Sequence, residues 1–162
     1  MNRKVEMRIL IVSDSHGYSG NIEKAIKMLS PDKLIFLGDG LREIENLSYI
    51  YDNIDFHTVC GNCDLYADAP GADILDICGY RFFFTHGHLY RVKGGLETFT
   101  AAAKERGATF ALYGHTHTAY TRYVDGMYII NPGSVSCPRE GKPSCAYIDI
   151  IGKNILTNTV EL

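Results

Sequence analysis

Short apolar runs alternate with amphipathic stretches along the first three quarters of the chain. We expect Ser19 to cap a helix whose apolar residues recur at the spacing of one helical face, and Pro31 to end it. Residues 41–51 and 96–106 predict two further helices. The runs rich in β-branched and aromatic residues predict buried strands at residues 7–13, 33–37, 54–59, 81–84 and 108–113.

The last quarter of the chain predicts antiparallel strands and no helix. Residues 120–124 and 127–130 flank the pair Asp125-Gly126, which favours a tight turn, and residues 146–160 predict a second hairpin. An earlier hairpin is expected within residues 74–84, with its turn at Gly79-Tyr80. The fold class is therefore α/β with an antiparallel addition (α+β), in which either one sheet is mixed or two sheets pack together.

Composition and charge limit the classes of ligand. The chain has 162 residues, 46% of them apolar, so we expect one domain over residues 1–162 with a sizeable core. The formal net charge is −3 and no run of Lys or Arg stands out, which argues against an extended nucleic acid as partner. If the substrate is an anion, bound metal ions are the obvious source of positive charge.

The cysteines and the apolar runs bear on location. There are five cysteines at scattered positions, an odd count that is not typical of a disulfide framework. Reduced thiols and a cytoplasmic location are therefore expected. No apolar run approaches the roughly 20 residues of a membrane span, and the stretch at residues 9–12 is too short for a signal-peptide core. We expect no membrane association.

Polar clusters follow each of the five predicted strands. In open α/β sheets the carboxyl ends of the strands hold the ligand, so these clusters should meet at one edge. If strand geometry persists through a cluster, residues one apart point the same way, and two imidazoles so placed can grip a divalent metal. Five of the six histidines lie in these clusters, and His57 is left as structural. The clusters are Asp14/His16, Asp39, Asn62, His86/His88 and His115/His117.

The order of these clusters resembles a known family. The motifs are D-x-H at residues 14–16, G-D at 38–39, G-N-x-D at 61–64, H-G-H at 86–88 and G-H-T-H at 114–117. This set is similar to that of the calcineurin-like metallophosphoesterase superfamily. The short chain and N-P-G-S at residues 131–134 resemble its compact bacterial and archaeal phosphodiesterase branch, which is also similar to the retromer scaffold subunit. The resemblance implies a four-layer fold, with two mixed sheets packed as a sandwich and helices outside.

The resemblance also implies two divalent metal ions, which activate water for in-line attack on a small phosphate ester. By motif position, Asp14, His16, Asp39 and His117 would hold the first ion. Asp39, Asn62, His86 and His115 would hold the second, with Asp39 shared. Carboxylate, imidazole and amide ligands suit manganese, which we place first, and also nickel, iron and zinc. Two carboxylates against two dications leave a positive pocket for an anionic substrate.

One position departs from the superfamily pattern. Many of its phosphatases carry histidine after G-N, and that histidine protonates the leaving group or contacts phosphate. Here the position is Cys63, and a thiol with a pKa near ~8.5 is poorly matched to this task. His88 could take that role, so Asp39, Asn62 and His88 are the candidate catalytic residues. Without a strong general acid, we expect a preference for phosphodiesters over phosphomonoesters.

Other functions stay open at this point. A phosphomonoesterase or pyrophosphatase of the same fold is one, and a non-catalytic protein-binding scaffold is another. The C-x-x-C at residues 60–63 is also found in thiol redox enzymes. That function would need a helix starting at the motif. Edge strands in the last quarter could also pair with a second copy of the chain, which would make a homo-oligomer.

Overall fold

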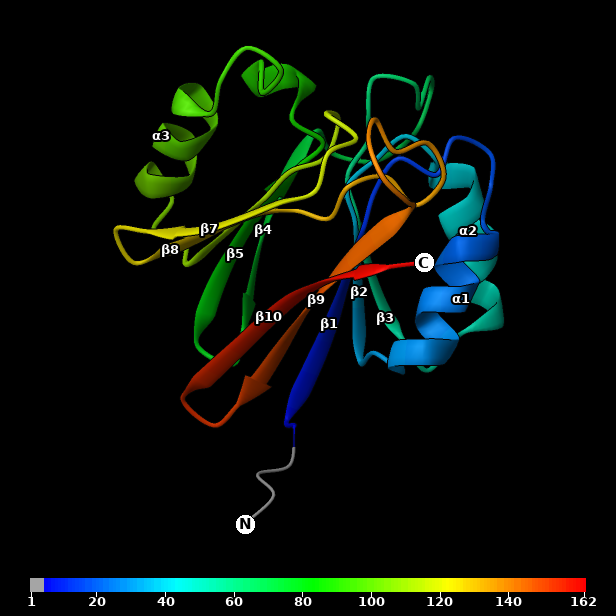
Figure 1. Ribbon diagram of the computed structural model, residues 1–162, viewed down its shortest axis with the longest axis horizontal. Coiled ribbons are helices and arrows are strands. Elements are labelled where there is room, and N and C mark those ends of the chain that lie inside the picture. The colour runs from blue at the N-terminus through cyan, green and yellow to red at the C-terminus, as the bar shows by residue number, and fades with distance from the viewer. Residues whose placement is uncertain (1–4) are drawn as a thin grey trace.

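The computed structural model describes residues 5–162 and arranges them as two five-stranded sheets packed face to face (Figure 1). The helices are α1 (Gly20–Leu29), α2 (Leu41–Ile50) and α3 (Glu97–Glu105), with a 3-10 turn η1 (His88–Tyr90). The strands are β1 (Met7–Val12), β2 (Lys33–Phe36), β3 (Asp55–Thr58), β4 (Ala72–Ile77), β5 (Tyr80–Thr85), β6 (Phe110–Leu112), β7 (Tyr120–Val124), β8 (Met127–Asn131), β9 (Ser144–Ile151) and β10 (Asn154–Glu161).

Both sheets are mixed. The first has the order β10-β9-β1-β2-β3, in which β1, β2 and β3 run parallel while β9 and β10 are antiparallel. The second has the order β4-β5-β6-β8-β7, in which β5, β6 and β8 run parallel between two antiparallel edge strands. The expectations of a mixed sheet and of two packed sheets are therefore both confirmed. β7 and β10 are edge strands, so pairing with a second copy stays a prediction.

The apolar strands are buried on both faces, which explains their nearly continuous hydrophobicity. In β1, Ile9 and Ile11 point into the core between the sheets, whereas Leu10 and Val12 point outward. Helices α1 and α2 cover that outer face, and Ile22 of α1 packs there with Leu10 and Val12. Alternation along a strand thus divides one apolar run between two layers.

The second sheet repeats this arrangement with α3 outside. Phe82 and Phe110 stack between the sheets, with ring centroids 4.4 Å apart. On the opposite face, Phe83 and Ala111 pack with Phe99 of α3. The layers are therefore two helices, a sheet, a second sheet and one helix, as Figure 1 shows. This confirms the expected four-layer sandwich.

The structure corrects two local predictions. The hairpin between β4 and β5 turns at Cys78-Gly79, one residue before the predicted pair, because both residues adopt the left-handed φ that a tight hairpin turn needs, 50° and 82°. Tyr80 is therefore already in the strand. Ser19 occupies the N-cap position of α1, but its side chain makes no capping hydrogen bond. No helix of the described residues is long and apolar enough to cross a membrane.

Candidate metal centre

The predicted site residues come together where the parallel strands of both sheets end, at the upper edge in Figure 1. Backbone hydrogen bonds join the loops at this edge. Asp14 N–H donates to the Gly38 carbonyl at 3.0 Å, and Gly114 N–H donates to the His86 carbonyl at 2.9 Å. Across the two sheets, His115 N–H donates to Asp14 Oδ2 at 3.1 Å. The edge is thus one continuous hydrogen-bonded surface.

Four of the predicted ligands form a first cluster around one carboxylate oxygen. Asp14 Oδ1 lies 3.2 Å from His117 Nε2 and 3.7 Å from His16 Nε2. The two imidazole nitrogens are themselves 3.2 Å apart. Asp39 Oδ2 completes the group, 3.8 Å from His16 Nε2. These are the four residues that the resemblance places around the first ion.

The second cluster centres on His86. Its Nε2 lies 3.1 Å from Asn62 Oδ1 and 3.1 Å from His115 Nδ1. Asp39 Oδ2 is 3.4 Å away from the same nitrogen. Asp39 therefore faces both clusters with one oxygen, which is the geometry that a bridging ligand requires.

The hydrogen bonds of these side chains leave acceptor atoms directed at each cluster, where a cation could bind. A carbonyl oxygen only accepts, so His86 Nδ1–H donates to Leu37 and His117 Nδ1–H donates to Cys137, each at 2.7 Å. In their neutral form these rings direct their Nε2 lone pairs into the clusters, as metal-bound histidines do. Asp14 Oδ1 is buried among these acceptors without a hydrogen-bond partner. Converging lone pairs repel one another unless positive charge lies between them.

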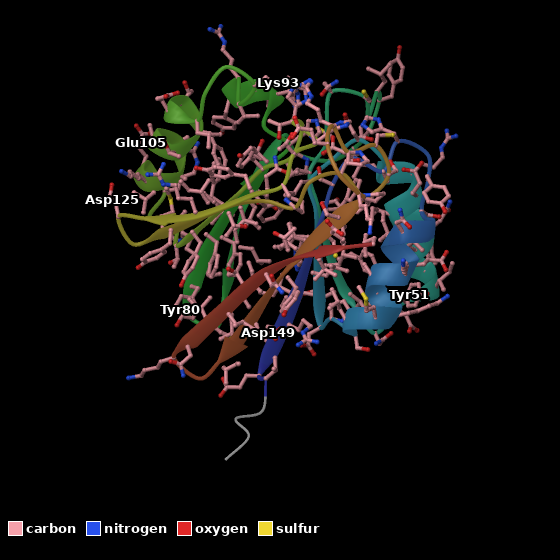
Figure 2. All side chains as sticks on the ribbon, viewed as in Figure 1. Tyr51, Tyr80, Lys93, Glu105, Asp125 and Asp149 are labelled. Atoms are coloured by element: carbon pink, nitrogen blue, oxygen red, sulfur yellow. The ribbon has the colours of Figure 1, made fainter. Side chains whose placement is uncertain are left out.

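The pKa shifts of the site residues show where the centre favours positive charge. The nearby carboxylate of Asp14 raises the pKa of both His16 and His117. Burial works against the charge of Asp14, but the histidines around it outweigh burial, and its pKa is lowered. By contrast, burial lowers the pKa of His115 to about 4, with the charges of His86 and Lys93 adding to the effect. Figure 2 shows Lys93 at this same edge. The carboxylate side of the centre favours positive charge, and His115 stays neutral.

Strand geometry does not persist through the clusters, so the expected shared face is wrong. β6 ends at Leu112, and His115 and His117 have left-handed φ values of 67° and 56°. The chain therefore turns between them, and His115 reaches His86 while His117 reaches His16. Asp14, His16 and Asp39 share this conformation, which non-glycine residues rarely adopt. Such strain at a cluster of polar side chains is typical of functional sites.

Asp64 is a supporting residue whose only signal in the sequence was its place in G-N-x-D. Its carboxylate accepts four backbone N–H bonds, from Asp39, Gly40, Leu41 and Gly61, at 2.7, 2.8, 3.0 and 2.8 Å. It thereby ties the loop that carries Asp39 to the loop after β3. The contact is so close that a Cβ on Gly61 would lie 2.0 Å from Asp39 Oδ1.

The loop after β8 supports the other side of the centre, a role that its N-P-G-S sequence did not reveal. Ser134 Oγ donates to the Asp14 carbonyl at 2.7 Å, and Ser136 Oγ donates to the Ser15 carbonyl at 2.8 Å. Asn131 Nδ2 donates to the Gly114 carbonyl at 3.0 Å. This segment therefore holds two loops of the centre in place, the loop after β1 and the loop after β6.

His88 and Cys63 lie beside the clusters, whereas His57 joins neither of them. The His88 ring is 5.4 Å from that of His86, in η1, and its buried Nδ1 has no hydrogen-bond partner. Burial lowers the pKa of His88. His57 lies within β3, its Nε2 3.0 Å from Asp55 Oδ2. Cys63 is exposed, and its Sγ lies within reach of His16 and Asp39.

The thiol redox interpretation is not supported. No helix starts at the C-x-x-C motif, because residues 60–71 form turns and loop up to β4. The pKa of Cys63 is raised, first by burial and then by the charge of Asp39, whereas a redox thiol needs a lowered pKa. All five cysteines are free.

A cleft of about 940 Å³ opens beside the first cluster. Its lining joins His16, Asp39 and Cys63 to residues of α2, β3 and the loop at 64–69. A sandwich with two clusters of potential metal ligands that share one aspartate at the carboxyl ends of its parallel strands is typical of metal-dependent phosphoester hydrolases.

The comparisons with known proteins agree with that class. Residues 7–153 match the family model for the calcineurin-like phosphoesterase superfamily domain, and the chain belongs to this family. It is 32% identical to phosphodiesterase MJ0936 of Methanocaldococcus jannaschii over 161 residues, covering 88% of this chain and 93% of that one.

Two solved structures show the fold. A conserved protein of Streptococcus pneumoniae TIGR4, a predicted phosphoesterase, matches 96% of this chain and 89% of its own with a TM-score of 0.82 and 27% identity. Vacuolar protein sorting 29 from Cryptosporidium parvum matches 98% of this chain and all of its own with a TM-score of 0.78 and 13% identity. The fold is thus shared with a predicted phosphoesterase and with a sorting protein.

Proposed function

We propose that this chain is a divalent-metal-dependent phosphodiesterase that acts on a small phosphate ester in the cytoplasm, as one domain over residues 1–162. The observation that carries the proposal is the buried Asp14 Oδ1, which has no hydrogen-bond partner and faces the ring nitrogens of His16 and His117. A second such cluster around His86 shares Asp39 with it. Family membership and the relative named phosphodiesterase support the reaction type.

The proposed ligand sets are those of the two clusters. Asp14, His16, Asp39 and His117 hold the first ion, and Asp39, Asn62, His86 and His115 hold the second. Hard oxygen donors beside imidazoles favour manganese, and nickel, iron and zinc also suit the set. When bound, two such ions lower the pKa of a water and polarise the phosphoryl oxygens.

The chain's own residues then position the substrate and move a proton. Asn62 and Asp39 face the place where the phosphate lies, and His88 donates a proton to the leaving oxygen. Because burial lowers the pKa of His88, only a small fraction of it carries a proton at neutral pH, and it is a poor general acid for that reason. Cys63 has a raised pKa and gives no rapid proton transfer either. Esters with good leaving groups should therefore react best, which favours activated diesters.

Hydrolysis of bis-p-nitrophenyl phosphate tests the function. The protein is stripped of metal with EDTA and assayed with and without added Mn²⁺, and p-nitrophenyl phosphate is run beside the diester. We expect Mn²⁺-dependent turnover with the diester faster, and its loss in Asp39→Asn, because one substitution removes the negative charge of the ligand that both ions share. Asp52→Asn, an exposed carboxylate outside the cleft lining, is the matched control. Unchanged turnover in Asp39→Asn would overturn the two-metal assignment.

Faster hydrolysis of the monoester than of the diester would instead favour the phosphomonoesterase or pyrophosphatase alternative. The fold shared with a vacuolar sorting protein favours a non-catalytic scaffold as the second candidate. That alternative predicts no turnover of either ester while Mn²⁺ still binds, as measured by calorimetry.

A further inference from the structure

The cleft beside the metal centre is larger than a phosphate group requires. Its volume of about 940 Å³ lies at the upper end of the roughly 300–1,000 Å³ found for small-molecule sites. It extends from His16 and Asp39 along α2 as far as Ser48 and past two residues of β3. A phosphate held at the metal centre would occupy one end, which leaves most of the cleft for an organic group of the substrate.

The free edge of β3 offers this group a pair of backbone hydrogen-bonding partners. Asp55 and Val59 donate their N–H groups to carbonyls on the β2 side, at 3.1 Å each. In a parallel ladder, alternate residues direct both N–H and C=O to one side, so Phe56 and Thr58 direct theirs away from β2. β3 ends its sheet, and these same two residues line the cleft.

One lining residue of the cleft is an aromatic on the loop between β3 and β4. Tyr66 is fully exposed, and its φ of 63° is a conformation that aromatic residues rarely adopt. Its neighbour Leu65, which also lines the cleft, is 75% exposed. An exposed aromatic ring beside a cleft is a platform on which a flat, apolar group can stack.

The charges of the lining exclude a strongly anionic occupant. Five carboxylates line the cleft, whereas Arg42 is the one Lys or Arg among the lining residues. Glu43 is engaged by Ser15 Oγ at 2.9 Å and Asp64 by four backbone groups, but Glu45 and Asp68 are exposed. An organic group that carries further phosphates would meet like charge here, so the cleft favours an organic group without negative charge.

We propose that the cleft holds the nucleoside of a nucleoside phosphodiester, with the base stacked on Tyr66 and its polar edge against the backbone of Phe56 and Thr58. A nucleobase is flat, carries no negative charge and is edged with hydrogen-bond donors and acceptors, which are the three properties that the cleft favours. The inference rests on the proposed phosphodiesterase function, because the phosphate has to lie at the metal centre.

Nucleotide binding tests the inference without turnover. The Mn²⁺-loaded protein is titrated calorimetrically with adenosine and uridine 5′-monophosphates, and with ribose 5-phosphate, which carries the same phosphate without a base. We expect at least one nucleotide to bind about 10-fold more tightly than ribose 5-phosphate. Tyr66→Ala should abolish that difference, and Tyr66→Phe should keep it. Tyr49→Ala, which removes another exposed tyrosine outside the lining, is the control.

Equal affinity for the nucleotides and ribose 5-phosphate overturns the inference, as does a nucleotide preference that Tyr66→Ala leaves unchanged. Turnover of methyl p-nitrophenyl phosphate and of a nucleoside 5′-p-nitrophenyl phosphate separates this failure from failure of the proposed function. Hydrolysis of both at equal kcat/KM without nucleotide preference keeps the enzyme and removes the nucleoside site. Tyr66-dependent nucleotide binding without hydrolysis of either ester keeps the site and removes the phosphodiesterase.

Discussion

Replacing Asp64 with asparagine should loosen the metal centre without touching any proposed ligand. In the native protein, Oδ2 accepts the N–H groups of Asp39 and Gly61, and Oδ1 accepts those of Gly40 and Leu41. An asparagine amide has one oxygen, and its NH₂ group would face two N–H donors. Whichever way the amide is turned, two of the four hydrogen bonds are lost.

The size of the effect follows from those two bonds. Hydrogen bonds to a charged group contribute about 1.5–3 kcal/mol each, so their loss costs roughly 3–6 kcal/mol. Asp64 is half-buried, and water can replace part of what is lost, so we expect a value near the lower limit of about 3 kcal/mol. Since the affected loops carry Asp39 and Asn62, the affinity for Mn²⁺ should also fall about 10–100-fold.

Urea unfolding in EDTA measures the stability, and calorimetric titration with Mn²⁺ measures the affinity. Asp68→Asn is the matched control, since it removes an exposed carboxylate four residues further along the same loop. If Asp64→Asn unfolds within about 0.5 kcal/mol of that control and binds Mn²⁺ equally well, the supporting role of Asp64 is refuted.

Three further predictions concern the residues around the centre. His88→Asn should slow hydrolysis of methyl phenyl phosphate about 100-fold but that of the p-nitrophenyl ester far less, because only the poorer leaving group needs a proton; equal loss on both esters contradicts this. A Cβ on Gly114 would lie 2.9 Å from Asp14 Oδ2, so Gly114→Ala should lose about 1–3 kcal/mol in urea unfolding, whereas Gly94→Ala, with nothing nearer than 3.5 Å, should be tolerated. In EDTA, the stability that His16 contributes should be full below about pH 6.5 and lost as pH rises through its raised pKa. Urea midpoints of wild type and His16→Gln from pH 5 to 9 check this, and a difference that grows with pH would contradict it.

The sequence by itself determined the elements and the residue types of the centre. Apolar periodicity is a local property, so it located the strands and helices to within a few residues, and the double burial of β1 was visible in its unbroken run from Ile9 to Val12. Polar clusters after each strand are also local, and their order identified the family. The hairpin turn lies one residue before its predicted position. Cysteine has no preference for the left-handed conformation that Cys78 adopts, so no local signal indicated a turn there.

Only the tertiary structure decided how those residues are combined. His115 and His117 are separated by one residue, yet they join different clusters, because the backbone turns after β6 and the loops of two sheets meet there. The four bonds to Asp64 depend on loops that follow β2 and β3, which sequence spacing does not relate. The cleft beside Tyr66 exists because β3 ends its sheet, and the edge of a sheet is fixed by strand order. Contacts between distant segments depend on packing of the whole chain, which no local pattern records.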